Sequence, residues 1–189
     1  MVPTAEATTP PDDDSDLMQR VQGGDEFALG VLMRRWERPV KSVIARLIFN
    51  ARETEDLAQE TFVRVWQQRM KFTPTAPFRP WIFAIAVNLA RNRLRWWRSR
   101  PEIAIEEWTE TPVEDPVGAG LVERAERAAA VRDAIAALPV DLREAIVLSE
   151  YEQLSQSEIA VVVGTTRKAV ENRVARARDR LRSSLKGWV

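Results

Sequence analysis

The sequence has 189 residues with 28 acidic and 28 basic side chains, and it contains neither cysteine nor histidine. Disulfide bonds are therefore impossible, and so are zinc sites built from Cys or His ligands. Catalysis by a histidine base or a cysteine nucleophile is excluded for the same reason. Apolar residues make up 45% of the chain, which is enough for packed cores and too much for a disordered protein.

The N-terminus and the apolar segments give no sign of secretion or of a membrane span. The first sixteen residues contain five acids and no base, which is the opposite of a secretory signal. The longest uncharged stretch in the apolar helical region, 80–90, is far shorter than the roughly 20 residues that span a bilayer. We therefore expect a soluble, cytoplasmic protein without stable membrane insertion.

Two separate segments of this neutral chain are strongly basic. Range 88–100 contains five arginines and no acid, and range 164–186 contains eight bases and two acids. The compensating acids lie elsewhere, with five at the N-terminus and six between residues 101 and 120. Two basic blocks separated by an acidic stretch predict two surfaces that face DNA.

Apolar residues at helical spacing predict four helices in the first half of the chain. Residues 1–14, which contain three prolines and a run of aspartates, are expected to form a disordered tail. Gly23 and Gly24 end the first helix, while Pro39 starts or kinks a continuation of the second. Pro80 is the predicted first residue of the fourth helix. Polar residues suited to capping precede the first three helices: Ser15, Asp25 and Thr54. The positions expected to face inward include Phe27, Trp36, Leu57, Trp66, Trp81 and Ile85.

The second half of the chain begins with a connector of unusual composition. Residues 101–120 hold six acids, no base, three prolines and two glycines, which favours an extended, flexible linker. Helices are predicted at about 121–137 and 140–150, with a break at Leu138 and Pro139. No convincing strand pattern occurs. The predicted fold is all-α, with two small helical domains joined by the acidic linker.

The most specific local pattern lies near the C-terminus. Ser155 and Glu158 form a capping box for a short helix, and Gly164 suits a tight turn that needs positive φ. Thr165 or Thr166 then caps a second helix, which completes a helix-turn-helix. The second helix can lie in the major groove, where Arg and Lys read guanine and Asn reads adenine. An arginine-rich solvated face is the alternative, and the cap, the turn and the charge together favour DNA binding. The outward side chains are Arg167, Lys168, Glu171, Asn172, Arg173 and Arg176.

The end of the fourth predicted helix combines aromatic and basic side chains. Aromatic faces stack on unpaired bases, while arginines follow phosphates and Asn amides bond base edges. The alternative is that the tryptophans pack inside the fold and the arginines are solvated; for Trp96 taken alone, packing is the favoured interpretation. The cluster as a whole predicts contact with single-stranded DNA: Asn88, Arg91, Asn92, Arg95, Trp96 and Trp97.

Four ordered segments resemble the extracytoplasmic-function group (group IV) of sigma-70 family RNA polymerase sigma factors. These segments are 53–68, 78–95, 138–160 and 173–182, and their order and spacing match regions 2 and 4 of that family. The resemblance implies that 15–100 is region 2 and that 121–189 is region 4. It covers nearly everything except the tail and the linker.

The resemblance also implies partners and site residues. Region 2 would bind the clamp helices of core RNA polymerase and capture bases of the opening −10 element. Region 4 would contact the polymerase flap and read the duplex −35 element with the second helix of the helix-turn-helix. Most relatives have an anti-sigma factor, so one is an expected partner. The implied polymerase-binding residues are Asp56, Gln59, Glu60, Arg64 and Gln67. The −10 set adds Phe72 and Phe78, from the loop 71–80, to Asn88, Arg91, Asn92, Arg95 and Trp96.

We therefore expect an alternative sigma factor that directs promoter-specific initiation, with no catalytic residues, metal or cofactor. The main alternative is an autonomous helix-turn-helix regulator, which leaves the Trp/Arg helix and the polymerase-facing helix without a role. A second alternative is a purely protein-binding helical adaptor. Dependence of DNA binding on polymerase separates the first alternative from a sigma factor, and salt-dependent DNA affinity separates the second.

Overall fold

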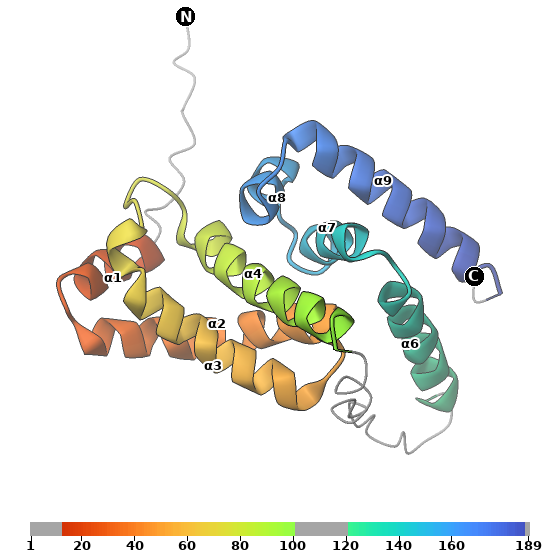
Figure 1. Cartoon of the computed structure of the whole chain (residues 1–189), viewed down its shortest axis with the longest axis horizontal. Coiled ribbons are helices and arrows are strands. Elements are labelled where there is room, and N and C mark those ends of the chain that lie inside the picture. Colours follow the sequence, from red (N-terminus) through yellow and green to blue (C-terminus); the bar gives the residue numbers. More distant parts are fainter. Residues whose placement is uncertain (1–12, 101–120, 188–189) are drawn as a thin grey trace, which may run out of the picture.

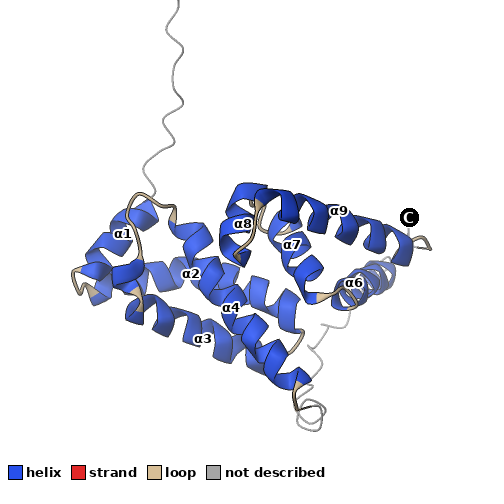
Figure 2. Cartoon of the chain, turned by 45° about the horizontal axis from the view of Figure 1, so that its top comes forward, coloured by secondary structure: helices blue, strands red, loops and turns tan. Residues whose placement is uncertain are grey.

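The computed structural model describes residues 13–100 and 121–187, and all regular structure in these two ranges is helical (Figures 1 and 2). The all-α prediction is thereby confirmed. The predicted tail and linker lie almost entirely outside the described residues. In chain order the helices are α1 (Asp13–Gln22), α2 (Glu26–Ile48), α3 (Ala51–Gln67), the 3-10 turn η1 (Arg69–Lys71), α4 (Phe78–Arg98), α6 (Leu121–Ala136), α7 (Val140–Glu150), α8 (Gln156–Val163) and α9 (Arg167–Ser184).

The first bundle, α1 to α4, is organised around Trp36 of α2. Its ring meets Phe78 and Phe83 of α4 edge-on, with centroids 5.8 and 5.7 Å apart. Its indole Nε1 donates a 2.9 Å hydrogen bond to Oδ2 of Asp14. Asp14 is therefore buried inside α1, and the predicted tail boundary at residue 14 and the cap at Ser15 are both wrong. The interaction that holds this segment is tertiary, because the carboxylate accepts from a tryptophan on another helix.

Helix boundaries depart from prediction in two further places. Asn50 rather than Thr54 caps α3, because its side chain accepts from the backbone N–H of Glu53. Pro39 lies within an uninterrupted α2, whose apolar stripe continues on both sides of it. Asp25 caps α2 as expected, and α4 begins at Phe78, two residues before the predicted Pro80.

The second bundle, α6 to α9, contains the predicted helix-turn-helix. Ser155 and Glu158 form the complete capping box at the start of α8. Gly164 ends α8 in the left-handed region, with φ of 67°, and the side chain of Thr166 caps α9. The inner face of α9 buries Val170, Val174 and Ala177 against the rest of this bundle. All local expectations for the motif are confirmed, and Thr166 is the cap.

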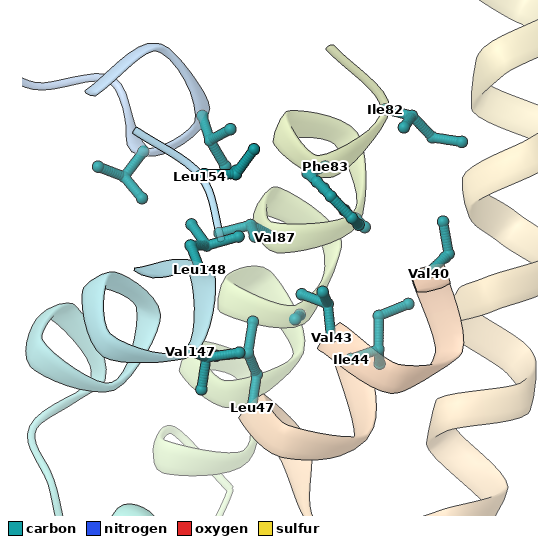
Figure 3. Close-up of a cluster of buried hydrophobic side chains, with 14 of the residues drawn as sticks. Val40, Val43, Ile44, Leu47, Ile82, Phe83, Val87, Val147, Leu148 and Leu154 are labelled. Atoms are coloured by element: carbon teal, nitrogen blue, oxygen red, sulfur yellow. The ribbon is translucent and has the colours of Figure 1, made fainter. Parts of the chain in front are cut away.

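The two bundles share one apolar core in this structure. Helix α4 packs against α8, and α2 packs against α7. Figure 3 shows side chains of both bundles meeting in the same cluster, all of them buried. The first bundle contributes Val43, Ile44, Leu47, Phe83 and Val87, and the second contributes Val147, Leu148 and Leu154.

The helix-turn-helix geometry depends on Gly164. A Cβ at this position would meet no atom within 4 Å, so the cost of a side chain there comes only from the positive φ. We expect Gly164→Ala to lower the free energy of unfolding by about 1 kcal/mol, since L residues are strained in this region. Chemical denaturation followed by circular dichroism measures the change. Gly187→Ala is the matched control, because its Cβ also meets open space and its φ is unstrained. Equal stability of both variants would contradict the prediction.

Candidate DNA and polymerase interfaces

The N-terminal part of α9 presents most of the predicted base-reading residues to solvent. Lys168 Nζ lies 3.0 Å from Glu171 Oε2, so the acid neutralises part of its neighbour's charge. Arg173 differs from the others because it is half-buried, with Nε 3.7 Å from Asp141 Oδ2 of α7. The exposed members of the predicted set are Arg167, Lys168, Glu171, Asn172 and Arg176.

Two arginines further along α9 are paired with acids of the same bundle. Arg178 Nη2 lies 2.7 Å from Glu150 Oε1, and Arg182 Nη1 lies 3.0 Å from Asp179 Oδ1. Arg167, Arg176 and Arg180 have no ion pair among the described residues, so free positive charge extends along the exposed face of the helix from its start. The start of the second helix is the end that enters the major groove in helix-turn-helix proteins.

The second cationic surface lies at the C-terminal half of α4. Asn88, Asn92 and Arg95 are exposed there, as predicted for a nucleic-acid face. Arg91 is half-buried because Glu144 of α7 accepts two hydrogen bonds from its guanidinium, at 2.9 and 2.6 Å. These hydrogen bonds raise the pKa of Arg91 above its ordinary value.

The two tryptophans at the end of α4 have different environments. Trp96 is half-buried, with the guanidinium carbons of Arg93 and Arg100 lying 5.7 and 5.0 Å from its ring centroid. Trp97 is buried in the core. The inclusion of Trp97 in the predicted single-strand face is therefore wrong in this structure, because its ring is already packed.

The aromatic residues of the loop before α4 are also buried. The ring centroid of Phe72 lies 5.3 Å from that of Trp81 and 5.9 Å from that of Phe78. Gln22 holds the base of the loop, donating to the carbonyls of Arg69 and Phe72 at 2.9 and 2.8 Å. Phe72 and Phe78 are thus buried in this structure, whereas direct contact with a base requires an exposed ring. The exposed part of the loop is 73–77. None of these residues belongs to the −10 set predicted from the sequence.

An apolar groove of about 750 Å³ runs between α2 and α3. Of the five predicted polymerase-binding residues, Gln59 lines it, and the other four are absent from its walls. Asp56, Arg64 and Gln67 are exposed on α3, and Glu60 pairs with Arg64 at 2.9 Å. The apolar walls come from Leu29, Met33, Ala58, Phe62, Val63 and Trp66.

Exposed apolar residues on α2 and α3 are the sequence signal for this groove. Phe27, expected to face inward, is 71% exposed near the start of α2, although it does not line the groove. Trp66, also expected to face inward, is half-buried and lines the groove. Met33 and Val63 are exposed apolar residues that lie off the core stripe. Apolar residues on both the core side and the outer side of two adjacent helices indicate a second apolar surface, in addition to the core.

Polar contacts reinforce the junction between the two bundles. Arg143 of α7 donates to the carbonyl of Leu47 at 2.6 Å and to that of Leu138 at 3.1 Å. Burial lowers the pKa of Arg143. Arg79 donates to the backbone carbonyl of Glu152, and burial raises the pKa of the Glu152 side chain despite the nearby guanidinium groups. Arginines thus satisfy carbonyls at helix ends on both sides of the junction.

Comparison with known proteins identifies the family of these two bundles. Residues 32–99 match the family "Sigma-70 region 2", and residues 128–181 match "Sigma-70, region 4". The RNA polymerase sigma-H factor of Pseudomonas aeruginosa is 33% identical over 182 residues, covering 91% of this chain and 93% of that protein. The ECF RNA polymerase sigma-E factor of Escherichia coli K12 is 32% identical, covering 88% and 91% of the two chains.

Solved structures agree with the sequence relatives. The structure of CnrH in complex with the cytosolic domain of CnrY superimposes with a TM-score of 0.70 at 28% identity, covering 93% of this chain and 99% of that one. The sigma factor RpoE of Bartonella quintana, solved with the anti-sigma factor NepR, has the same fold, with a TM-score of 0.68 at 23% identity. Among the described helices, none is long and apolar enough to cross a membrane. The chain belongs to the sigma-70 family, as an extracytoplasmic-function sigma factor.

Proposed function

We propose that this sigma factor docks on core RNA polymerase through the groove between α2 and α3 and reads a promoter with two separate surfaces. The observation that supports this most directly is the pair of cationic faces, one on α4 and one on α9, carried by different bundles. A promoter offers two elements to such a chain, one opened and one duplex. An autonomous regulator needs only the α9 surface, so it leaves the α4 surface unexplained.

The α9 surface suits duplex DNA. Its exposed start carries Arg167, Asn172 and Arg176, which can bond guanine and adenine edges in the major groove. Glu171 can accept from cytosine, and it repels phosphate, so it favours a base contact at its position. The region 4 bundle would therefore hold the −35 element.

The α4 surface suits opened DNA. Asn88, Asn92 and Arg95 are exposed on one helix, and Trp96 of the same helix contacts two arginines. The exposed loop 73–77 precedes this helix and is held at its base by Gln22. Buried Phe72 and Phe78 stiffen the loop. Their role is to position the exposed residues 73–77, and they do not stack on bases themselves. We propose that this surface captures bases of the −10 strand as the duplex opens, offsetting the cost of unstacking.

The groove suits a protein helix. Its floor is apolar, and its rim carries Glu26, Glu37, Lys41, Glu55 and Gln59. Lys41 is held between Glu37 and Glu55, at 2.8 and 2.7 Å, and these hydrogen bonds raise its pKa. An apolar floor with a charged rim is how helix-in-groove recognition is built. We propose that a clamp helix of the polymerase occupies it.

Base reading by α9 is tested at Arg176. We expect Arg176→Ala to weaken binding of the holoenzyme to its promoter duplex by about 1–3 kcal/mol, with the loss concentrated at one base pair. Binding competition against single-base promoter variants measures both quantities. Arg182→Ala is the control, because Arg182 is also exposed on α9 but is paired with Asp179 further along. A loss spread evenly over all sequences would identify Arg176 as a phosphate contact instead.

Polymerase docking is tested by placing a charge in the groove. Val63 is 52% exposed on α3, so Val63→Glu should fold and yet oppose burial of the groove floor. We expect co-purification with core polymerase to fall at least about tenfold, since an unpaired buried charge is costly. Val161→Glu is the matched control, because Val161 is 69% exposed on α8, in the other bundle.

The same assay separates the groove from the charged face of α3. If the acids make the principal contact, the double variant Asp56→Lys and Glu60→Lys loses polymerase and Val63→Glu keeps it. That outcome would reject the groove and retain docking by α3. Normal co-purification of both variants would reject α3 altogether.

A further inference from the structure

Glu144 is the most completely buried acid in the described junction between the two bundles. Only 3% of its side-chain surface is exposed. Both of its oxygens are used by one residue: Oε1 accepts from Arg91 Nε at 2.9 Å, and Oε2 accepts from Arg91 Nη2 at 2.6 Å. This is the parallel two-bond geometry in which a guanidinium holds a carboxylate or a phosphate. Glu144 comes from α7 of region 4, whereas Arg91 comes from α4 of region 2.

Arg91 lies on the α4 surface that is proposed to hold the opened −10 strand. A DNA phosphate can accept from the same two N–H groups that Glu144 occupies, because carboxylate and phosphate present matching oxygens to the guanidinium fork. Asn88 Oδ1 accepts a further hydrogen bond from Arg91 Nη1 at 3.3 Å. Glu144 and a phosphate therefore cannot hold Arg91 in this way at once.

The packing around this pair makes the competition between Glu144 and phosphate for Arg91 depend on how the two regions are arranged. Helix α8 lies against α4, and the shared apolar cluster of Figure 3 keeps α7 beside α2 and α4. Two other arginine contacts, from Arg143 to Leu47 and from Arg79 to Glu152, cross the same junction. While the junction is intact, breaking the pair would leave the buried Glu144 carboxylate without its partner, which is costly, so release of Arg91 favours movement of region 4 away from region 2. DNA that binds Arg91 must then favour the arrangement in which the two regions are separated. By reciprocity, separation of the regions must favour DNA binding.

We propose that Glu144 is an internal competitor of promoter DNA, which occupies Arg91 in the free sigma factor and releases it when regions 2 and 4 separate. The inference rests on the proposed role of the α4 surface. It assigns Glu144 a part in controlling when that surface is available. The apolar cluster holds the two regions together. While they are together, the Glu144–Arg91 pair prevents Arg91 from contacting DNA.

The chain has no cysteine, which allows site-specific labelling without background. Cysteines replacing Met70 and Val161, both strongly exposed and in different bundles, would carry a fluorophore pair that reports domain separation. In this labelled protein we expect Glu144→Gln to lower the transfer efficiency, because the neutral amide no longer balances the half-buried guanidinium. We also expect the free protein to bind a fluorescein-labelled, mixed-sequence single-stranded DNA up to about tenfold more tightly, as the competent state becomes populated.

Glu150→Gln is the matched control. Glu150 lies on the same helix and pairs with Arg178 at 2.7 Å, but both partners belong to region 4. Its loss removes an ion pair without touching the junction, so transfer efficiency should stay at the wild-type value. The exchanged pair Arg91→Glu with Glu144→Arg should restore high transfer efficiency while leaving DNA binding weak, because the α4 surface has then lost a cation.

Three results would overturn the proposal. Unchanged transfer efficiency and affinity in a folded Glu144→Gln protein would make Glu144 a structural residue only. Separation of the domains without tighter DNA binding would show that Arg91 is not the contested contact. If Glu144→Gln fails to fold, single-stranded DNA titrated into the labelled wild-type protein decides instead, because binding without a fall in transfer efficiency excludes competition. Promoter-directed transcription by the wild-type holoenzyme tests the proposed function independently of all three.

Discussion

The packing of α7 and α8 against α2 and α4 determines how the α4 surface of this sigma factor is presented. The apolar cluster that forms the junction contains Leu47 and Val87 from region 2 and Val147 and Leu148 from region 4. Burying these side chains removes apolar area from water, and the gain is available only while the regions stay together. Under the proposed function, a promoter with two separated elements requires the opposite arrangement. Separation of the regions would then cost the stability that this burial contributes.

The two DNA surfaces respond differently to this constraint. The start of α9 is exposed whether or not the regions are packed together, so Asn172 and Arg176 are available in both arrangements. The α4 surface is partly occupied, because α8 lies beside it and Glu144 holds Arg91. Under the proposed function, duplex recognition is thus a property of one domain, whereas single-strand recognition depends on the position of the other domain. This asymmetry fits an order of events in which polymerase binding and domain separation precede strand capture.

The proposed polymerase-binding surface has two parts, a row of exposed charged residues on α3 and the apolar groove between α2 and α3. The charged residues of α3, such as Asp56 and Arg64, are exposed and visible in the sequence, and Arg64 is already paired with Glu60. The groove beside them combines Met33 from α2 with Val63 and Trp66 from α3. Surface ion pairs contribute little net free energy, whereas an apolar groove offers area to bury. The groove is the stronger basis for affinity, and the charges set orientation.

Local chemistry was sufficient to determine the helix-turn-helix from the sequence. The capping box of Ser155, the left-handed Gly164 and the Thr166 cap each act within a few residues, so their spacing alone encodes them. The helical class and the two basic blocks were readable for the same reason. Only the tertiary structure decided that Asp14 belongs to α1, that Phe72 and Phe78 are buried, and that Glu144 pairs with Arg91 across the junction. Each of these three features depends either on a partner more than twenty residues away in the sequence or on which of two apolar faces of a segment is buried. Periodicity reports that a face is apolar, but the packing of other helices determines which apolar face leaves water.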